Sequence, residues 1–121
     1  VEEGTEGVRL MTVHKAKGLE FAVVILADMS CKLSRDEASR YLDTRQGLCA
    51  LRLGGWTPVD LAEHNDLEAR RDRAEGVRLA YVAATRARDL LVIPTVGDAP
   101  YERSWVDPLA ACVYPPLGER Q

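Results

Sequence analysis

The stretch that decides the fold is Phe21-Ala22-Val23-Val24-Ile25-Leu26-Ala27, a continuous apolar run that ends at Asp28. Its length and its β-branched residues predict a strand buried on both faces, as in a parallel sheet covered by helices. A second apolar run, Leu90–Ile93, predicts another buried strand, which Pro94 stops. Upstream, the loose alternation of Val8–Val13 predicts a third strand.

A long helix is expected between the two apolar strands. Residues 60–88 are helical in character, and we expect a break near Asn65. The first half, through Arg73, is densely charged and should be solvated, whereas Leu79–Ala84 is apolar on every side and should be buried. Strands that alternate with a long helix indicate an α/β layer fold with a largely parallel sheet.

Two further segments flank this core pattern. Arg40–Asp43 and Leu48–Leu53 are expected to form a small β-hairpin, because the residues between them end in glycine as hairpin turns often do. The tail from Asp98 contains four prolines and no periodicity, so we expect it to be irregular. Trp105 and Tyr114 are the residues expected to pin it to the body.

The composition indicates a cytoplasmic globular domain. The length of 121 residues suits one compact domain or one half of a split motor. No apolar run approaches the roughly 20 residues that a membrane helix needs. Three scattered cysteines fit neither a disulfide framework nor a zinc cluster, so no metal site is expected, and Cys49 should be a small buried residue. Because the chain starts at Val1 without a methionine, we expect it to be part of a longer one.

The first segment with chemical potential is Thr12–Phe21. A strand would deliver a hydroxyl, the His14 imidazole and two ammonium groups to one edge of the sheet, where they can donate to phosphates. The net charge of −3 gives no general attraction to nucleic acid, so any DNA contact has to come from such a local patch. A solvated basic turn between two strands explains the same residues on charge alone.

The second segment is Arg78–Asp89. Arg86 continues the helical stripe of Leu79, Val82 and Ala83, and Arg88 continues a neighbouring stripe. Two arginines that end a buried helix should not both be ordinary surface charges, so an anionic partner is expected. That partner is either a ligand phosphate or a nearby carboxylate, and attraction to the helix C-terminus is a further explanation.

These two segments resemble motifs of one protein family. Thr12–Phe21 with the strand after it resembles motif V of UvrD/Rep-type superfamily 1 DNA helicases, and Arg78–Asp89 with its following strand resembles their motif VI. The form of the second motif is closest to the RecB/AddA-like helicase–nuclease branch. The resemblance implies a RecA-like, P-loop NTPase-type fold, with residues 1–97 forming the second motor lobe, called 2A, and residues 98–121 forming a tail.

The resemblance implies a nucleotide site shared with another lobe. Arg86 would be the arginine finger, which contacts the γ-phosphate and offsets charge on the transferring phosphoryl group. Glu20 would accept a hydrogen bond from the ribose, and Gly18 and Lys17 would lie near the phosphates. The cofactor would be ATP with Mg²⁺, bound mainly by the N-terminal RecA-like lobe.

DNA contacts are implied as well. Thr12 and His14 would face single-stranded DNA, whereas Tyr81 and Arg88 would hold the helix in place. The implied partners are single-stranded DNA, the N-terminal lobe and a nuclease domain or subunit, with no membrane. The resemblance implies unwinding in the 3′ to 5′ direction.

The sequence lacks the main phosphate-binding loop of such a motor. It contains no G-x-x-x-x-G-K-[ST] pattern, and Asp36-Glu37 follow polar residues instead of the apolar strand that a Walker B pair needs. We therefore expect the chain alone to be inactive as a helicase. The alternative hypotheses are a non-catalytic interaction module and, less in keeping with the paired motifs, a different RecA-like ATPase.

Overall fold

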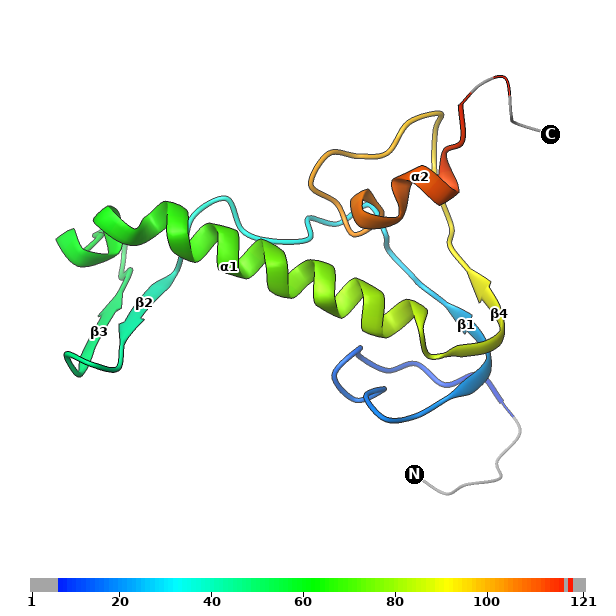
Figure 1. Cartoon of the computed structure of the whole chain (residues 1–121), viewed down its shortest axis with the longest axis horizontal. Helices are drawn as coiled ribbons and strands as arrows, with labels where there is room; N and C mark the ends of the chain where they lie inside the picture. Colours follow the sequence, from blue (N-terminus) through cyan, green and yellow to red (C-terminus); the bar gives the residue numbers. More distant parts are fainter. Residues whose placement is uncertain (1–6, 117, 119–121) are drawn as a thin grey trace.

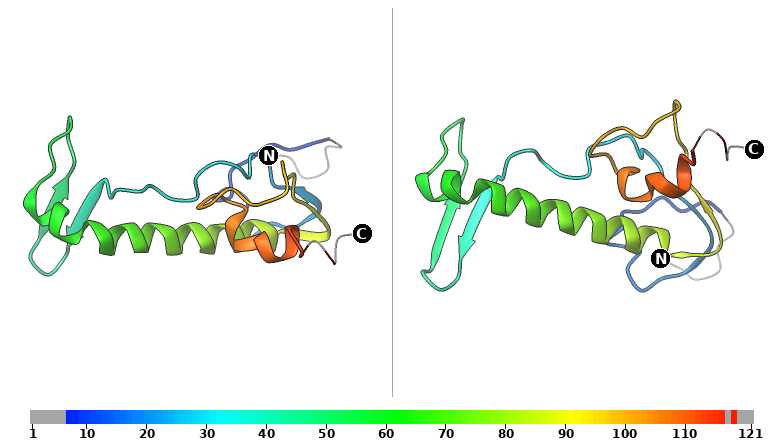
Figure 2. Two further views of the ribbon diagram at one scale, coloured as in Figure 1. Left: turned by 90° about the horizontal axis from the view of Figure 1, so that it is seen from above. Right: turned by 45° about the horizontal axis from the view of Figure 1, so that its top comes forward.

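The computed structural model describes residues 7–116 and 118. Its central element is the helix α1, Val59–Ala84, which is 26 residues long (Figure 1). A parallel strand pair lies at the C-terminal end of this helix, and a β-hairpin lies at its N-terminal end. The views of Figure 2 agree that the two small sheets lie at opposite ends of α1. The described part is therefore an α/β structure in which one long helix connects two separate sheets.

The parallel pair consists of β1, Phe21–Ile25, and β4, Ala87–Val92. The parallel pairing predicted from the two apolar runs is confirmed, although β1 ends before Leu26 and β4 begins three residues before Leu90. Burial of β1 on both faces is wrong, because its central residue, Val23, is 51% exposed. Burial of both faces would need a layer of helices on each side of the sheet. Helix α1 contacts β4 more than it contacts β1.

The strand predicted for Val8–Val13 is wrong. Its residues have no regular secondary structure, and Val8 and Leu10 are 99% and 95% exposed. Residues with high β-propensity form a strand only when a neighbouring strand completes the hydrogen-bond ladder. In the part of the chain that the structure describes, neither β1 nor β4 pairs with this segment.

The hairpin is confirmed. Its strands β2, Arg40–Asp43, and β3, Leu48–Leu51, pair in antiparallel register. The Asp43 carboxylate accepts hydrogen bonds from the backbone N–H groups of Arg45 at 2.8 Å and Gln46 at 3.2 Å, which stabilises the turn. Ala50 of β3 packs with Leu61 of α1, whose side chain is fully buried.

Cys49 lies on the outer side of β3 and is exposed, so its predicted burial is wrong. The strand alternation explains this, because Ala50 takes the side that faces α1. Among the described residues there is no group of side chains that could hold a metal ion, and no helix is long and apolar enough to cross a membrane.

Helix α1 is continuous, so the break predicted near Asn65 is wrong. The Asn65 side chain is half-buried, and its Oδ1 accepts a hydrogen bond of 3.0 Å from the backbone N–H of Ala38. The predicted burial of Leu79–Ala84 on every side is also wrong: Ala80 is 1% exposed, whereas Tyr81 is 68% exposed. One face of α1 is covered and the other is open, as in an amphipathic helix.

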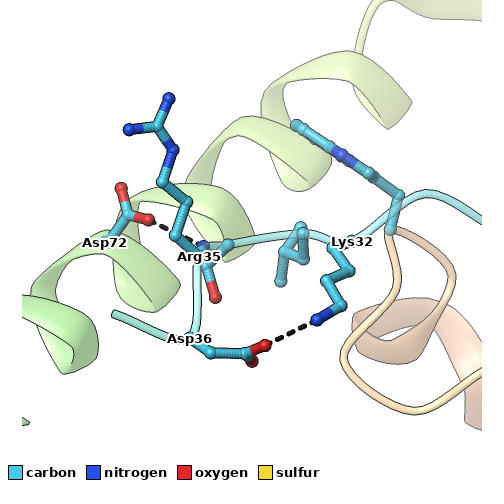
Figure 3. A pocket seen from close by; sticks show the side chains of 7 residues that line it. Lys32, Arg35, Asp36 and Asp72 are labelled. Carbon is cyan, nitrogen blue, oxygen red and sulfur yellow. Dashed lines mark hydrogen bonds and ion pairs between the residues drawn. The ribbon is translucent and has the colours of Figure 1, made fainter. Parts of the chain in front are cut away.

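The segment between β1 and β2 runs along α1 and packs closely against it. Leu33 is buried against Gly76, and a Cβ added at Gly76 would lie 2.7 Å from Leu33 Cγ and 2.9 Å from the Leu33 carbonyl oxygen. A glycine is needed here because there is no space for a side chain. Asp72 adds a polar contact, since it accepts a hydrogen bond of 3.1 Å from the backbone N–H of Arg35 (Figure 3).

The C-terminal segment has more structure than the irregular tail expected from its prolines. It contains a 3₁₀ helix, η1, Asp107–Leu109, and one turn of α-helix, α2, Ala110–Val113. Val106 is buried, and the backbone N–H of Trp105 donates to the Cys31 carbonyl at 3.0 Å. Trp105 therefore does attach this segment to the body, through its backbone.

A charge cluster reinforces the attachment. The Asp36 carboxylate accepts from Lys32 Nζ at 2.5 Å and from Arg103 Nη1 at 3.0 Å, and it lines a shallow open pocket with Arg35 and Asp72 (Figure 3). The hydrogen bonds from Lys32 and Arg103 hold the pKa of Asp36 below its ordinary value.

Acid is expected to loosen this cluster. Because the folded pKa of Asp36 is lowered, its contribution is present above the ordinary carboxyl range and is lost as pH falls through the folded value, below about pH 4. We expect the fluorescence of Trp105, which lines the same pocket, to change in that range when Trp56 is replaced by phenylalanine. Asp36→Asn should remove the change, and an identical acid transition in this variant would contradict the assignment.

Candidate functional site

The site lies where the C-terminal end of α1 meets β1. Helix α1 ends at Ala84 and β4 begins at Ala87, so Thr85 and Arg86 form the connection. The helix predicted from the sequence continues past this point and wrongly includes Arg86. The end of the helix is fixed because the Arg86 carbonyl accepts a hydrogen bond of 2.9 Å from the backbone N–H of Phe21, which starts the pairing with β1.

The half-buried Arg86 guanidinium is held by oxygen atoms of the chain itself. Nε donates to the Val82 carbonyl at 3.1 Å, Nη1 to the Leu19 carbonyl at 3.1 Å, and Nη2 to Thr85 Oγ1 at 3.3 Å. Among residues 7–116, no carboxylate forms an ion pair with Arg86, so a buried salt bridge does not explain it. These contacts use three of the five N–H groups of a guanidinium.

Arg86 brings the two motif segments together. Its backbone oxygen accepts from Phe21, and its side chain donates to Leu19, two residues earlier. The two hydrogen bonds bracket Glu20 and fix its backbone beside the connection, while its side chain remains exposed. The predicted finger and the predicted ribose acceptor therefore lie next to each other, although they are far apart in the sequence.

The basic segment forms a compact turn. The backbone N–H of Ala16 donates to the carbonyl oxygens of Thr12 and Val13, both at 3.1 Å, and buried Ala16 anchors the turn. Gly18 ends it with a φ of 82°, a conformation that favours glycine. Lys17 and the neighbouring polar side chains are exposed, as a site for phosphates requires.

The predicted DNA-facing residues lie on this turn. Thr12 is exposed, and its Oγ1 accepts a weak hydrogen bond of 3.4 Å from the backbone N–H of Lys15. His14 is exposed. Within the described part of the chain, neither side chain forms a hydrogen bond with Arg86. The structure thus places the backbone of Glu20 between the two residues that bond Arg86, and leaves Thr12 and His14 on the adjoining surface.

One charged residue near the turn was missed by the sequence analysis. Glu75 of α1 accepts two hydrogen bonds from Arg78, at 2.7 and 2.5 Å, which lower the pKa of Glu75. The charges of His14 and Lys17 lower the same pKa further, so the turn lies near this face of the helix. The spacing of Glu75 and Arg78 indicates a helical pair, but only the fold shows that the pair lies near the turn.

The role expected for Arg88 is wrong. It lies in β4 with 64% of its side chain exposed and forms an ion pair of 2.9 Å with Asp89, which raises the pKa of Arg88 and lowers that of Asp89. The helical stripe ends before Arg88 because the strand begins at Ala87. Tyr81 is exposed too, so neither residue is placed to hold the helix.

Comparison with known proteins shows the family of the chain. A family model described as the UvrD-like helicase C-terminal domain matches residues 1–97, and the chain belongs to this family. Similar curated proteins include an ATP-dependent helicase/nuclease subunit of Lacticaseibacillus casei (strain BL23), which is 37% identical over 99 residues, covering 77% of this chain and 8% of that protein. The protein of the same name from Bacillus anthracis is 33% identical over 120 residues, covering 87% of this chain and 9% of that protein.

The resemblance to UvrD/Rep-type helicases, and to their RecB/AddA-like branch, is thereby confirmed. The chain spans less than a tenth of the length of these relatives. The activity of a whole helicase/nuclease therefore enters only as a proposal for this chain.

Proposed function

We propose that this chain contributes motif V and motif VI to the second, RecA-like motor lobe of an ATP-dependent DNA helicase of the helicase/nuclease class. The main support is that Arg86 connects the two motif segments by hydrogen bonds to Leu19 and Phe21. A guanidinium held at such a junction is pre-organised to meet a phosphate presented by another lobe. Residues 1–97 form the lobe in this proposal, and the protein acts in the cytoplasm in DNA repair or recombination.

The nucleotide roles in this proposal come from the resemblance of the motifs, and the arrangement of the described residues supports them. Arg86 keeps two N–H groups for the γ-phosphate of ATP, which the N-terminal lobe would hold together with Mg²⁺. The exposed carboxylate of Glu20 would accept a hydrogen bond from the ribose hydroxyl. Gly18 lets the backbone approach the phosphates, and Lys17 adds a positive charge beside them.

DNA binding is assigned to the turn that adjoins Arg86. Thr12 and His14 present hydrogen-bonding side chains on its exposed surface, where they would contact the backbone of single-stranded DNA. Since the same turn leads into Leu19 and Glu20, a shift of the turn on DNA would reach Arg86 through one hydrogen bond. This short connection would couple the nucleotide state to the affinity for single-stranded DNA.

The test is ATP hydrolysis by the longest natural chain that contains these residues, with and without single-stranded DNA. The proposal expects hydrolysis that DNA stimulates, together with strand displacement from a substrate with a 3′ single-stranded tail. Hydrolysis that is absent or indifferent to DNA would instead favour a non-catalytic interaction module. Unwinding only from a 5′ tail would contradict the proposed 3′ to 5′ direction.

His14→Ala is expected to weaken binding of single-stranded DNA roughly twofold to tenfold, the range of one lost hydrogen bond. The ATPase rate at saturating DNA should change less. Fluorescence anisotropy of a labelled oligonucleotide measures the affinity. The matched control is His64→Ala, because His64 stacks on Tyr41 beside the hairpin, at the other end of α1. Equal losses of DNA affinity in the two variants would contradict a DNA contact by His14.

A further inference from the structure

The connection between α1 and β4 contains a closed ring of three hydrogen bonds. Thr85 Oγ1 donates to the Val82 carbonyl at 3.1 Å, and Arg86 Nε donates to the same oxygen at 3.1 Å. Arg86 Nη2 closes the ring by donating to Thr85 Oγ1 at 3.3 Å. The hydroxyl group acts as a donor and an acceptor at once, and the carbonyl oxygen uses both lone pairs.

The ring forms because the helix ends here. The last four carbonyl groups of an α-helix lack partners within it, and Val82 carries one of them. The backbone N–H groups that follow go elsewhere: that of Thr85 donates to Tyr81 at 3.0 Å, and that of Arg86 donates to Ala83 at 3.2 Å. The Val82 oxygen is therefore left for side chains, and the negative end of the helix dipole favours the guanidinium.

The ring fixes the orientation of the guanidinium. Bonds from Nε and Nη2 define one edge of the planar group, and the bond from Nη1 to the Leu19 carbonyl fixes the opposite side. One N–H on each Nη remains for a ligand. Without the Thr85 hydroxyl, Nη2 would lose its anchor on this edge, and only the bonds from Nε and Nη1 would restrain the plane of the guanidinium.

We propose that Thr85 is a positioning residue that aims Arg86 at the transferring phosphoryl group. This inference rests on the proposed function, because it needs Arg86 to act as the finger. The Thr85 side chain itself is not placed to touch the nucleotide in this proposal. It acts by holding Arg86, so its loss should impair the transition state more than the binding of ATP.

The experiment compares Thr85→Val and Thr85→Ser in the longest natural chain that contains these residues, by steady-state ATP hydrolysis at saturating single-stranded DNA. Valine keeps the branched shape and removes the hydroxyl, and serine keeps the hydroxyl. We expect Thr85→Val to lower kcat about tenfold, the weight of one hydrogen bond to a charged group, with KM for ATP unchanged within about twofold. Thr85→Ser should retain kcat within about twofold.

Two further readouts separate this role from a loss of folding. Thr57→Val is a matched control, because Thr57 lies just before the other end of α1. The kcat of Thr57→Val should match the wild type. The Tm of both Thr85 variants should match it too, since Thr85 is exposed. The affinity for ADP with aluminium fluoride, a mimic of the transition state, should fall about tenfold in Thr85→Val, whereas that for ADP alone should not change.

The outcomes are distinguishable. Normal kcat in Thr85→Val, or an equal loss in Thr85→Ser, overturns the role of the hydroxyl while the proposed function stands. A rise in KM at constant kcat also overturns it, because uniform binding would then have been lost. A wild-type protein without DNA-stimulated hydrolysis overturns both the proposed function and this inference.

Discussion

Arg86→Ala is expected to lower the DNA-stimulated ATPase rate about a thousandfold, the effect of losing an arginine finger. The guanidinium is already held at 3.1 Å from two carbonyl oxygens. The side chain therefore loses little conformational entropy when the nucleotide binds. A side chain that acts on developing charge contributes mainly to kcat. The measurement is steady-state hydrolysis over a range of ATP concentrations, and ATP binding should persist in the variant.

The control for this prediction lies two residues away. Arg88→Ala removes the same charge, but Arg88 is exposed and paired with Asp89, so activity should stay within about twofold of the wild type. Because Arg86 also holds Leu19, the Tm of each variant has to be measured beside the rate. A folded Arg86→Ala protein with normal turnover would remove Arg86 from the site and favour the interaction-module hypothesis.

The sequence predicted the elements whose pattern is local. The hairpin strands were found because glycine marks the end of their turn, and Phe21–Ile25 was found because β-branched residues follow one another. Burial was predicted poorly, since it depends on what covers an element. Val8 has the side chain of a strand residue but no neighbouring strand in the described part of the chain, and Tyr81 faces away from the packed side of α1.

The site was predicted by resemblance and not by geometry. The motifs predicted that Arg86 and Glu20 act in one function, but the contact through Leu19 and Phe21 depends on the register of two parallel strands. The start of β4 at Ala87 lies between Arg86, which is held by carbonyl groups, and Arg88, which is a surface charge. Helix periodicity alone gave both arginines the same environment, because it could not show where the helix ends.

Gly76→Ala is expected to lower the free energy of unfolding by about 1–3 kcal/mol, the usual cost of forcing an extra group into a packed contact. Helix propensity alone would predict the opposite sign, because alanine is favoured over glycine by about 1 kcal/mol inside a helix. The contact decides the sign here. The added Cβ would lie 2.7 Å from Leu33 Cγ, which can rotate away, and 2.9 Å from the Leu33 carbonyl oxygen, which cannot.

The same helical turn offers a matched control. Ala74 is exposed, so Ala74→Gly reports helix propensity without the contact and should cost about 1 kcal/mol. Both variants are compared by urea unfolding. In a double-mutant cycle, Leu33→Ala should recover only part of the loss in Gly76→Ala, because the carbonyl oxygen remains in place. A gain of stability in Gly76→Ala would mean that the segment before β2 moves off the helix freely. The packing that carries this segment past α1 would then contribute little to the fold.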